Sequence, residues 1–291
     1  MNHNKDFPIN ILMVLAMLTW GLSWTNAKIV GQYAEPQLIM IWRFFFASIS
    51  LLPIMISYRI SFKINKDTIS LILLNSIFMV SYNFFYFKGT QVGFAGMGGV
   101  LVTTLNPILT TLFASIFLNK TLSKKDFIGL FIGTVGGSII LRFWDLEISS
   151  LIDSGSLFFL LASLSWVFVT INTSKLKNKK SYINYSFWSF IFSFLLCLIK
   201  SDKENIFIVF HFDWVFWINL ILLATFAMSF GTSIFFLASV RLGPTKASTF
   251  IFLVPIAAMG FAIYFLSEPL YVSTVIGGIL GMIAVYIINH N

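Results

Sequence analysis

The segment Leu-Ala-Met-Leu-Thr-Trp at residues 15–20 returns as Leu-Ala-Ser-Leu-Ser-Trp at residues 161–166. More matches follow in the same order at nearly the same offset, among them Pro107 with Pro255 and Gly133 with Gly281. A single match would carry little weight in so biased a composition, but an ordered series indicates an internal repeat. We therefore expect two related halves, residues 1–146 and residues 147–291.

The composition decides where such a repeat can fold. Hydrophobic residues make up 58% of the 291 residues and charged residues only 10%, and the mean hydropathy is +0.89. Soluble domains carry roughly 25% charged residues, and disordered chains are polar and charged. Both classes are excluded, and an integral membrane protein remains.

Long apolar segments fill almost the whole chain and leave no room for a sizeable soluble domain. A membrane-spanning helix needs about 20 apolar residues, whereas barrel strands are shorter and alternate in polarity. The sequence therefore predicts an all-α integral membrane protein with ten transmembrane helices. The predicted spans are 9–29, 37–58, 68–88, 95–118, 126–143, 155–174, 182–200, 214–240, 246–267 and 271–289.

The few charges are sorted by loop. With the N-terminus inside, lysines gather in the predicted inner loops, for example Lys120, Lys124, Lys125 and the segment 175–180, while most acidic residues fall outside. This asymmetry is the positive-inside pattern. It predicts an inner-membrane protein with both termini cytoplasmic, and it explains the net charge of +8 without nucleic acid as a partner.

Five spans per half is an odd number, so the second half must enter the membrane upside down. The charges agree, because the loop with Lys120 matches a loop with Glu268 and Pro269 in the second half, which has no lysine. Inverted repeats are typical of secondary transporters, where two related gates face one central site. We expect alternating access for a small-molecule solute.

Several short motifs resemble the drug/metabolite transporter superfamily, and within it the EamA-type family of ten-span transporters. They are Trp20-Gly21, Arg43-Phe44, Asn106-Pro107, the run 242–247, Val254-Pro255 and the run 266–270. The resemblance implies export of amino acids or related amphipathic metabolites. It departs from the family pattern at Ser267, where the family usually has Gly, and at 119–120, which read Asn-Lys and lack the usual acid.

Other functions stay open at this stage. A carrier of nucleotide-linked or lipid-linked sugars would need a cluster of cationic groups in the cavity, and Arg43 alone offers little. A non-transporting membrane partner protein is the other alternative, and the inverted repeat disfavours it.

The third and eighth predicted spans each carry a polar stripe at helical spacing. Polar groups are costly in hydrocarbon, so the stripes face either a water-filled cavity or a neighbouring helix to which they hydrogen-bond. The candidate solute-binding residues on these stripes are Asn75, Met79, Tyr82 and Tyr86 in the first half, and Thr225, Ser229 and Thr232 in the second.

The fourth span contributes Thr103 and Asn106, and Pro107 can interrupt the helix near mid-membrane. We expect either a helix break that exposes backbone groups to the solute or a packing seam with a tolerated kink. Pro255 is the matching candidate for a gate in the second half, but it has no preceding Asn, so the site is expected to be asymmetric.

Aromatic and cationic side chains complete the candidate site. Trp20 and Trp24 lie four residues apart, and Trp166 is the repeat partner of Trp20; these rings can stack on a solute or on its ammonium group, or anchor the helix at the interface. Arg43 lies within a span, where it either holds a solute carboxylate or pairs with a group such as Glu35.

Acidic residues and histidines are missing from mid-span positions, and Cys197 is the only cysteine. Catalysis requires a convergent set of acids, bases or nucleophiles, so we expect no enzyme, no metal and no cofactor. Buried carboxylates commonly relay protons, so we also expect weak or no proton coupling. Glycines in the fifth and tenth spans predict packing away from the cavity, in a monomer or a homodimer surrounded by lipid.

Overall fold

The computed structural model describes residues 3–117, 123–140, 153–176, 182–199 and 203–289. The described residues are mainly helical. In chain order the elements are α1 (His3–Val30), α2 (Pro36–Ser57), α3 (Lys66–Val92), α4 (Ala95–Phe117), α5 (Lys124–Ile140), α7 (Ser156–Ser174), α8 (Tyr182–Ile199), η2 (Lys203–His211), α9 (Trp214–Leu222), η3 (Leu223–Thr232), α10 (Ser233–Arg241), α11 (Pro244–Thr249), η4 (Phe250–Phe252), α12 (Leu253–Leu266) and α13 (Val272–Asn289). The expected boundary between residues 146 and 147 lies outside the described residues, as does the Asn-Lys pair at 119–120.

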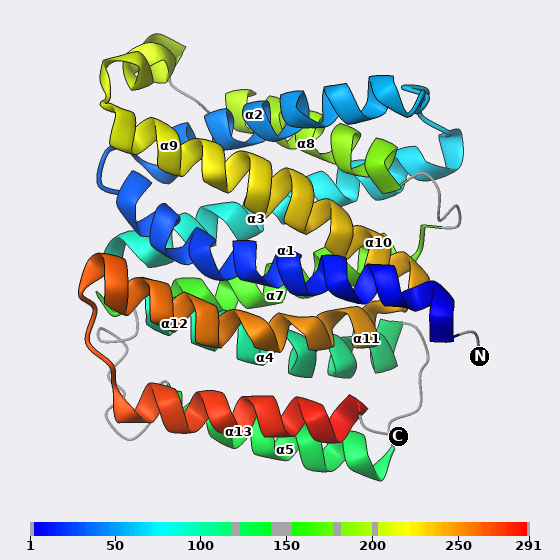
Figure 1. The fold of residues 1–291 in the computed structure, drawn as a ribbon, viewed down its shortest axis with the longest axis vertical. Coiled ribbons are helices and arrows are strands. Elements are labelled where there is room, and N and C mark those ends of the chain that lie inside the picture. Colours follow the sequence, from blue (N-terminus) through cyan, green and yellow to red (C-terminus); the bar gives the residue numbers. More distant parts are fainter. Residues whose placement is uncertain (1–2, 118–122, 141–152, 177–181, 200–202, 290–291) are drawn as a thin grey trace.

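The long helices run roughly side by side (Figure 1). α2 and α8 lie toward one end of the bundle and α5 and α13 form the other, with α1, α12, α4 and α7 between them. The beginning of α1 and the end of α13 lie at the same side of the bundle. We call the opposite side the outer end; it contains the connections 31–35, 93–94 and 267–271.

Contacts between helices repeat when the two halves are exchanged. α1 packs on α12 as its counterpart α7 packs on α4, and α3 packs on α8 as η3 packs on α2. Two further pairs, α2 with α8 and α5 with α13, join equivalent helices of the two halves. This is the arrangement expected of two inverted copies that meet face to face.

Eight segments are long and apolar enough to cross a membrane, and they include the composite segments Trp214–Arg241 and Pro244–Leu266. These eight agree with the predicted spans. α5 and the apolar part of α13 (Val272–Ala284) are shorter, so their membrane crossing, and with it the count of ten, stays a prediction. Large apolar side chains such as Phe131 and Ile116 are exposed on the outside of the bundle, which suits a surface covered by lipid.

The second half is irregular where the first is regular. α3 is one continuous α-helix, but its counterpart contains the π-helical segment η3 between α9 and α10. α4 is likewise continuous through Pro107, whereas its counterpart divides into α11, η4 and α12. Pro255 stands at the third position of α12, where a missing backbone N–H costs little. A backbone break is therefore not found at Pro107, and the irregular backbone lies in the second half.

Glycines let α5 and α13 approach each other closely. A Cβ atom added to Gly277 would lie 2.4 Å from the Gly136 carbonyl oxygen, and one added to Gly281 would meet Thr104 of α4. Small residues at such crossings are the usual means of close helix packing in membranes. α13 is thereby attached both to α5 and to the central bundle.

We expect Gly277→Ala to lower the thermal unfolding temperature of the detergent-solubilised protein. The added methyl group meets backbone, which cannot move aside as a side chain can, and overpacking of this kind costs about 1–3 kcal/mol. Gly260→Ala is the matched control, because a Cβ at Gly260 meets nothing within 4 Å. There the higher helix propensity of Ala should leave stability unchanged or slightly raised. Equal shifts for both variants would contradict the packing described here.

Candidate functional site

A small cavity lies near the middle of the membrane-spanning segments, between the two halves. Its walls come from α1, α2, α3, α4, α7, η3, η4 and α12. The lining residues are Trp20, Ser23, Trp24, Arg43, Tyr82, Asn83, Val102, Thr103, Asn106, Trp166, Met228, Thr232, Ile251 and Val254. Solute sites of inverted-repeat transporters occupy this position, at the repeat interface and near mid-membrane.

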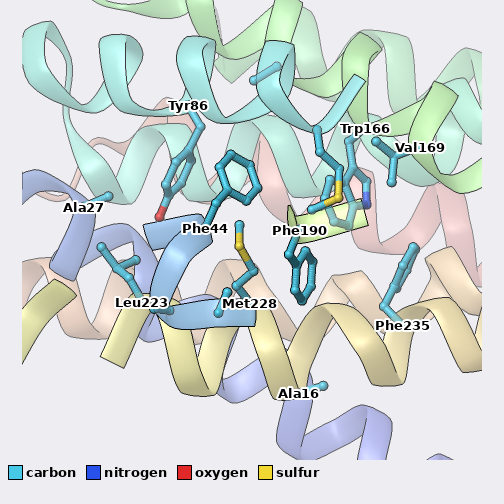
Figure 2. Packing of buried hydrophobic residues seen from close by; sticks show 14 of the residues in the cluster. Ala16, Ala27, Phe44, Tyr86, Trp166, Val169, Phe190, Leu223, Met228 and Phe235 are labelled. Carbon is cyan, nitrogen blue, oxygen red and sulfur yellow. The ribbon is translucent and has the colours of Figure 1, made fainter. Parts of the chain in front are cut away.

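The two tryptophans matched by the sequence repeat meet each other at this cavity. The ring centroids of Trp20 and Trp166 are 5.1 Å apart and the rings are nearly perpendicular, at 86°. Phe235 of α10 contacts both, at 5.1 Å and 5.6 Å. Edge-to-face contact is a favoured geometry for aromatic rings. Trp166 and Phe235 point into the core from opposite sides in Figure 2, with Met228 of η3 also directed inward.

Tyrosines from α3 extend this aromatic wall. Tyr82 lies 4.7 Å from Trp166 between ring centroids and is stacked on Tyr86 at 5.7 Å. Tyr86 in turn packs edge-on against Trp24, and its hydroxyl donates to the Ser23 carbonyl oxygen at 2.6 Å. Tyr82 and Trp24 therefore line the cavity, while Tyr86 holds α1 in place behind them.

Trp20 also bonds to the irregular segment η3. Its indole Nε1 donates to the Ala227 carbonyl oxygen at 2.8 Å, and the neighbouring Thr19 hydroxyl donates to the Phe226 carbonyl oxygen at 3.3 Å. Gly231 makes room for the ring, because a Cβ there would lie 2.7 Å from Nε1. π-Helical turns often mark functional sites, and here one borders the cavity and receives donors from the opposite half.

Arg43 is the cation of the cavity wall and is only 5% exposed. One guanidinium nitrogen donates to the Asn83 amide oxygen at 2.8 Å, and the group lies over the rings of Tyr86 and Phe87 at 5.4 Å and 5.3 Å. Pairing with Glu35, one of the alternatives for Arg43, is not observed. Glu35 instead lies 3.8 Å from the Lys88 amine.

Other polar atoms at the cavity are buried without a partner. The amide oxygen of Asn106 and the indole nitrogen of Trp166 have no hydrogen-bond partner, although the two side chains are only 2% and 4% exposed. Buried polar atoms are normally hydrogen-bonded. An acceptor and a donor thus line the cavity unused. Thr103, by contrast, donates to the Gly99 carbonyl oxygen.

Five predicted site residues do not line the cavity: Tyr86, which lies behind Tyr82 and Trp24, and Asn75, Met79, Thr225 and Ser229. Asn75 donates to the Ser189 hydroxyl at 3.2 Å and to the Met79 sulfur at 3.5 Å, and both Asn75 and Met79 are fully buried between α3 and its neighbours. Ser229 donates to the Ala47 carbonyl oxygen of α2 at 2.5 Å. Thr225 donates to the Ile221 carbonyl oxygen of its own helix. These side chains are occupied by packing and backbone contacts.

Sequence reasoning missed six lining residues. Asn83 was detectable, because it lies four residues after Met79 and three before Tyr86 and so belongs to the same stripe. Met228 was harder to predict. Hydrogen bonds from i to i+5 in η3 rotate side chains away from the directions that an α-helical period predicts. Ser23 gave a weak polar signal beside Trp24. Val102, Ile251 and Val254 are apolar and gave no signal.

Hydrogen bonds at the outer end join neighbouring helices and connections. The Glu268 carboxylate accepts from the backbone N–H groups of Ala95 at 2.7 Å and Gly96 at 2.8 Å, which stabilises the beginning of α4. The Lys28 amine donates to the carbonyl oxygens of Gly93 at 2.7 Å and Gln91 at 3.3 Å. α1 is thereby joined to the end of α3 and the connection after it, and α4 is joined to the connection before α13.

A second contact at the outer end joins α1 to α9. The Tyr33 hydroxyl donates to the Asp213 carboxylate at 2.9 Å, and Asp213 also accepts from the backbone N–H of Val215 and of Phe216 at the beginning of α9. The hydrogen bond from Tyr33, followed by that from Phe216, lowers the pKa of Asp213, and the same contact raises the pKa of Tyr33. Both groups are thus held in the forms that make this contact at neutral pH.

The cavity volume is about 30 Å³. Ligand pockets of proteins usually measure roughly 300–1,000 Å³, so the space seen here suits water and is too small for a metabolite. The structure is thus a closed form, and a solute can enter only after helices separate on one side.

Comparison with known proteins identifies the family to which this architecture belongs. The model of the EamA-like transporter family matches the chain twice, at residues 7–142 and 153–290. The chain belongs to the EamA-like transporter family. This EamA-like protein is therefore a membrane transporter, and each of its halves matches one copy of the family unit.

Relatives of this EamA-like transporter have about the same length. It is 24% identical to the uncharacterized transporter YyaM of Bacillus subtilis (strain 168), over 97% of the chain and 93% of that protein. It is 24% identical to the uncharacterized transporter YvbV of the same organism, over 96% of the chain and 90% of that protein. A crystal structure that is 13% identical superimposes over 98% of both chains with a TM-score of 0.67, which shows the same fold.

Two asparagines provide a matched test of which side chains serve the cavity. We expect Asn106→Ala to reduce solute uptake while leaving thermal stability nearly unchanged, because its amide oxygen has no partner to lose. Asn75→Ala should lower stability by about 1–3 kcal/mol, because it breaks a buried hydrogen bond to Ser189. Thermal unfolding and uptake per folded molecule in proteoliposomes measure both effects. A stability loss for Asn106→Ala with normal uptake would assign that residue to packing.

Trp20→Phe should reduce uptake by roughly threefold to tenfold, since a hydrogen bond is worth about 0.5–1.5 kcal/mol. The ring remains but can no longer donate to Ala227 in η3. Trp188→Phe is the control, because it also removes an indole bond to a backbone carbonyl, that of Phe62, but lies outside the cavity. If both variants change uptake equally, the bond between Trp20 and η3 has no special role.

Proposed function

We propose that this transporter exports an amino acid or a related amphipathic metabolite across the inner membrane by alternating access. The observation that carries the proposal is the cavity between the halves, which combines aromatic walls with unused polar groups of different kinds. Arg43 can receive an anion, the Asn106 amide oxygen can accept from an amine, and the Trp166 indole can donate. A solute with an apolar body and a zwitterionic end suits this set.

Alternating access is supported by the closed form together with the repeat. The cavity is too small for such a solute, and hydrogen bonds hold neighbouring elements together at the outer end. Two inverted copies provide two related sets of helices that can separate in turn. The positions of α1's beginning and α13's end at one side agree with the proposal that both termini are cytoplasmic, as the lysine-rich loops predict.

A carrier for nucleotide-linked sugars is less well supported. Diphosphate groups are usually held by several cationic side chains, and Arg43 is the one cationic residue that lines the cavity. Membership of the family argues against a non-transporting partner protein and against a catalytic role.

The side chains around the cavity support a proposal about coupling. The lining residues include no Asp, Glu or His, which are the groups that commonly relay protons. We propose transport with weak or no proton coupling, as a uniporter or an exchanger.

Uptake by proteoliposomes tests cargo and coupling together. The solute is first selected as the compound that raises the unfolding temperature of the purified protein, within a panel of amino acids, nucleosides and polyamines. We expect an amino acid to be selected, and its uptake to persist when a protonophore collapses the pH gradient. Selection of a polyamine or a nucleoside contradicts the proposed cargo, and uptake that stops with the gradient contradicts the proposed coupling.

A further inference from the structure

Arg43 carries a charge for which the chain offers little compensation. It is the eighth residue of α2, so it lies roughly 10 Å from the beginning of the helix at 1.5 Å per residue. Its partners are the neutral amide of Asn83 and the faces of two aromatic rings, and its Nε has no hydrogen-bond partner.

Three acidic groups at the outer end are engaged elsewhere. Glu35 pairs with Lys88, Asp213 with Tyr33, and Glu268 with the backbone of α4. Within the part of the chain that the structure describes, Arg43 therefore forms no ion pair. A buried ion without a counter-ion is costly, and binding of an anion relieves that cost.

We infer that the solute supplies this missing negative charge, and that Arg43 makes the transporter an exchanger of carboxylate-bearing solutes. The inference rests on the proposed transport function and specifies its substrate class. The solute's carboxylate binds the Arg43 guanidinium, whose planar donors match a carboxylate. Its apolar body lies among Trp20, Trp166 and Tyr82.

Exchange follows from the same charge. A carrier must close around its site whenever it changes sides. With a carboxylate bound, Arg43 is neutralised during closure. Without a bound carboxylate, the Arg43 cation must be buried alone. The empty carrier therefore converts slowly between the forms that open to the two sides of the membrane. Solute leaving on one side is then replaced by another carboxylate solute, instead of the empty carrier returning by itself.

Matched sets of probes test the charge requirement. Each set contains an amino acid, its carboxamide, which keeps the amine but lacks the carboxylate, and its deamino acid, which keeps only the carboxylate. Sets based on tryptophan and leucine cover aromatic and aliphatic bodies. We expect both carboxylates of a set to raise the unfolding temperature at concentrations at least tenfold below those the amide needs. Amides that stabilise the protein equally well overturn the inference while leaving transport intact.

Variants of Arg43 test its part directly. Arg43→Gln should abolish the preference for carboxylates, and Arg43→Lys should retain part of it. Arg241→Gln, which removes an exposed cation at the end of α10, should leave it unchanged. If Arg43→Gln prefers carboxylates to carboxamides as strongly as the wild type does, the inference is overturned. If Arg43→Gln does not fold, Arg43→Lys decides: it keeps the charge but not the planar fork, so the preference must weaken.

Exchange is measured as trans-stimulation. Wild-type proteoliposomes loaded with unlabelled amino acid should take up labelled amino acid several-fold faster than empty ones. In Arg43→Gln the empty form no longer buries a cation alone, so this ratio should fall toward one, whatever the absolute rate. If Arg43 has only a structural role, its substitution changes the absolute rate of uptake but not the ratio of uptake by loaded and empty proteoliposomes. An unchanged ratio overturns the inference.

A small anion separates this inference from the choice of cargo. Propionate at tens of millimolar should stabilise the wild type and not Arg43→Gln, even if no amino acid in the sets binds. Amino acids without effect, combined with stabilisation by propionate, contradict the proposed cargo alone. If propionate stabilises neither protein, or stabilises both equally, the proposed anion site at Arg43 is contradicted.

Discussion

The lack of water inside the bilayer is the constraint on which this structure depends. Every polar group in a span must find its partner within the protein, so each serine, threonine and asparagine indicates a contact or a cavity. Most are satisfied locally; Thr111, for example, donates to the carbonyl oxygen of Pro107, four residues earlier in α4. Buried polar atoms without a partner are the exceptions, and three of them, on Asn106, Trp166 and Arg43, belong to residues that line the cavity. At the cavity, these atoms are available to a solute.

The same constraint explains how the two halves meet. Apolar faces gain nothing from leaving lipid, so close packing and side-chain hydrogen bonds hold the helices together. Gly99 permits the approach of Trp24 and Ala258, and Gly21 the approach of Ala257. The bond from Trp20 to the Ala227 carbonyl then joins the halves at the cavity itself. A residue that lines the cavity is thus also part of the interface that must change during transport.

How far the sequence could predict this structure depends on the kind of feature. The all-helical fold and its long apolar spans follow from composition and periodicity, which act along the whole chain, whereas the count of five spans per half stays a prediction. The candidate site was predicted in part, because Tyr82 and Asn75 belong to one stripe but meet different neighbours. Tyr82 meets Trp166 at the cavity and Asn75 meets Ser189 of α8. A helical period identifies which residues share one face of a helix, but it does not identify the neighbouring helix or cavity that this face contacts. The π-helical η3 was not predicted, because no single residue type signals it.

The two halves have diverged in complementary ways. The first half contributes the buried cation and the unused amide, Arg43 and Asn106, on the regular helices α2 and α4. The second half has Ser189 and Val254 at the corresponding positions, and contributes the irregular backbone of η3 and η4 instead. Regular helices hold a charged group in fixed geometry, whereas segments with altered hydrogen bonding have fewer i to i+4 bonds to break when a span bends. The cation and the unused amide that we propose for solute recognition therefore lie in the first half, and the irregular backbone lies in the second.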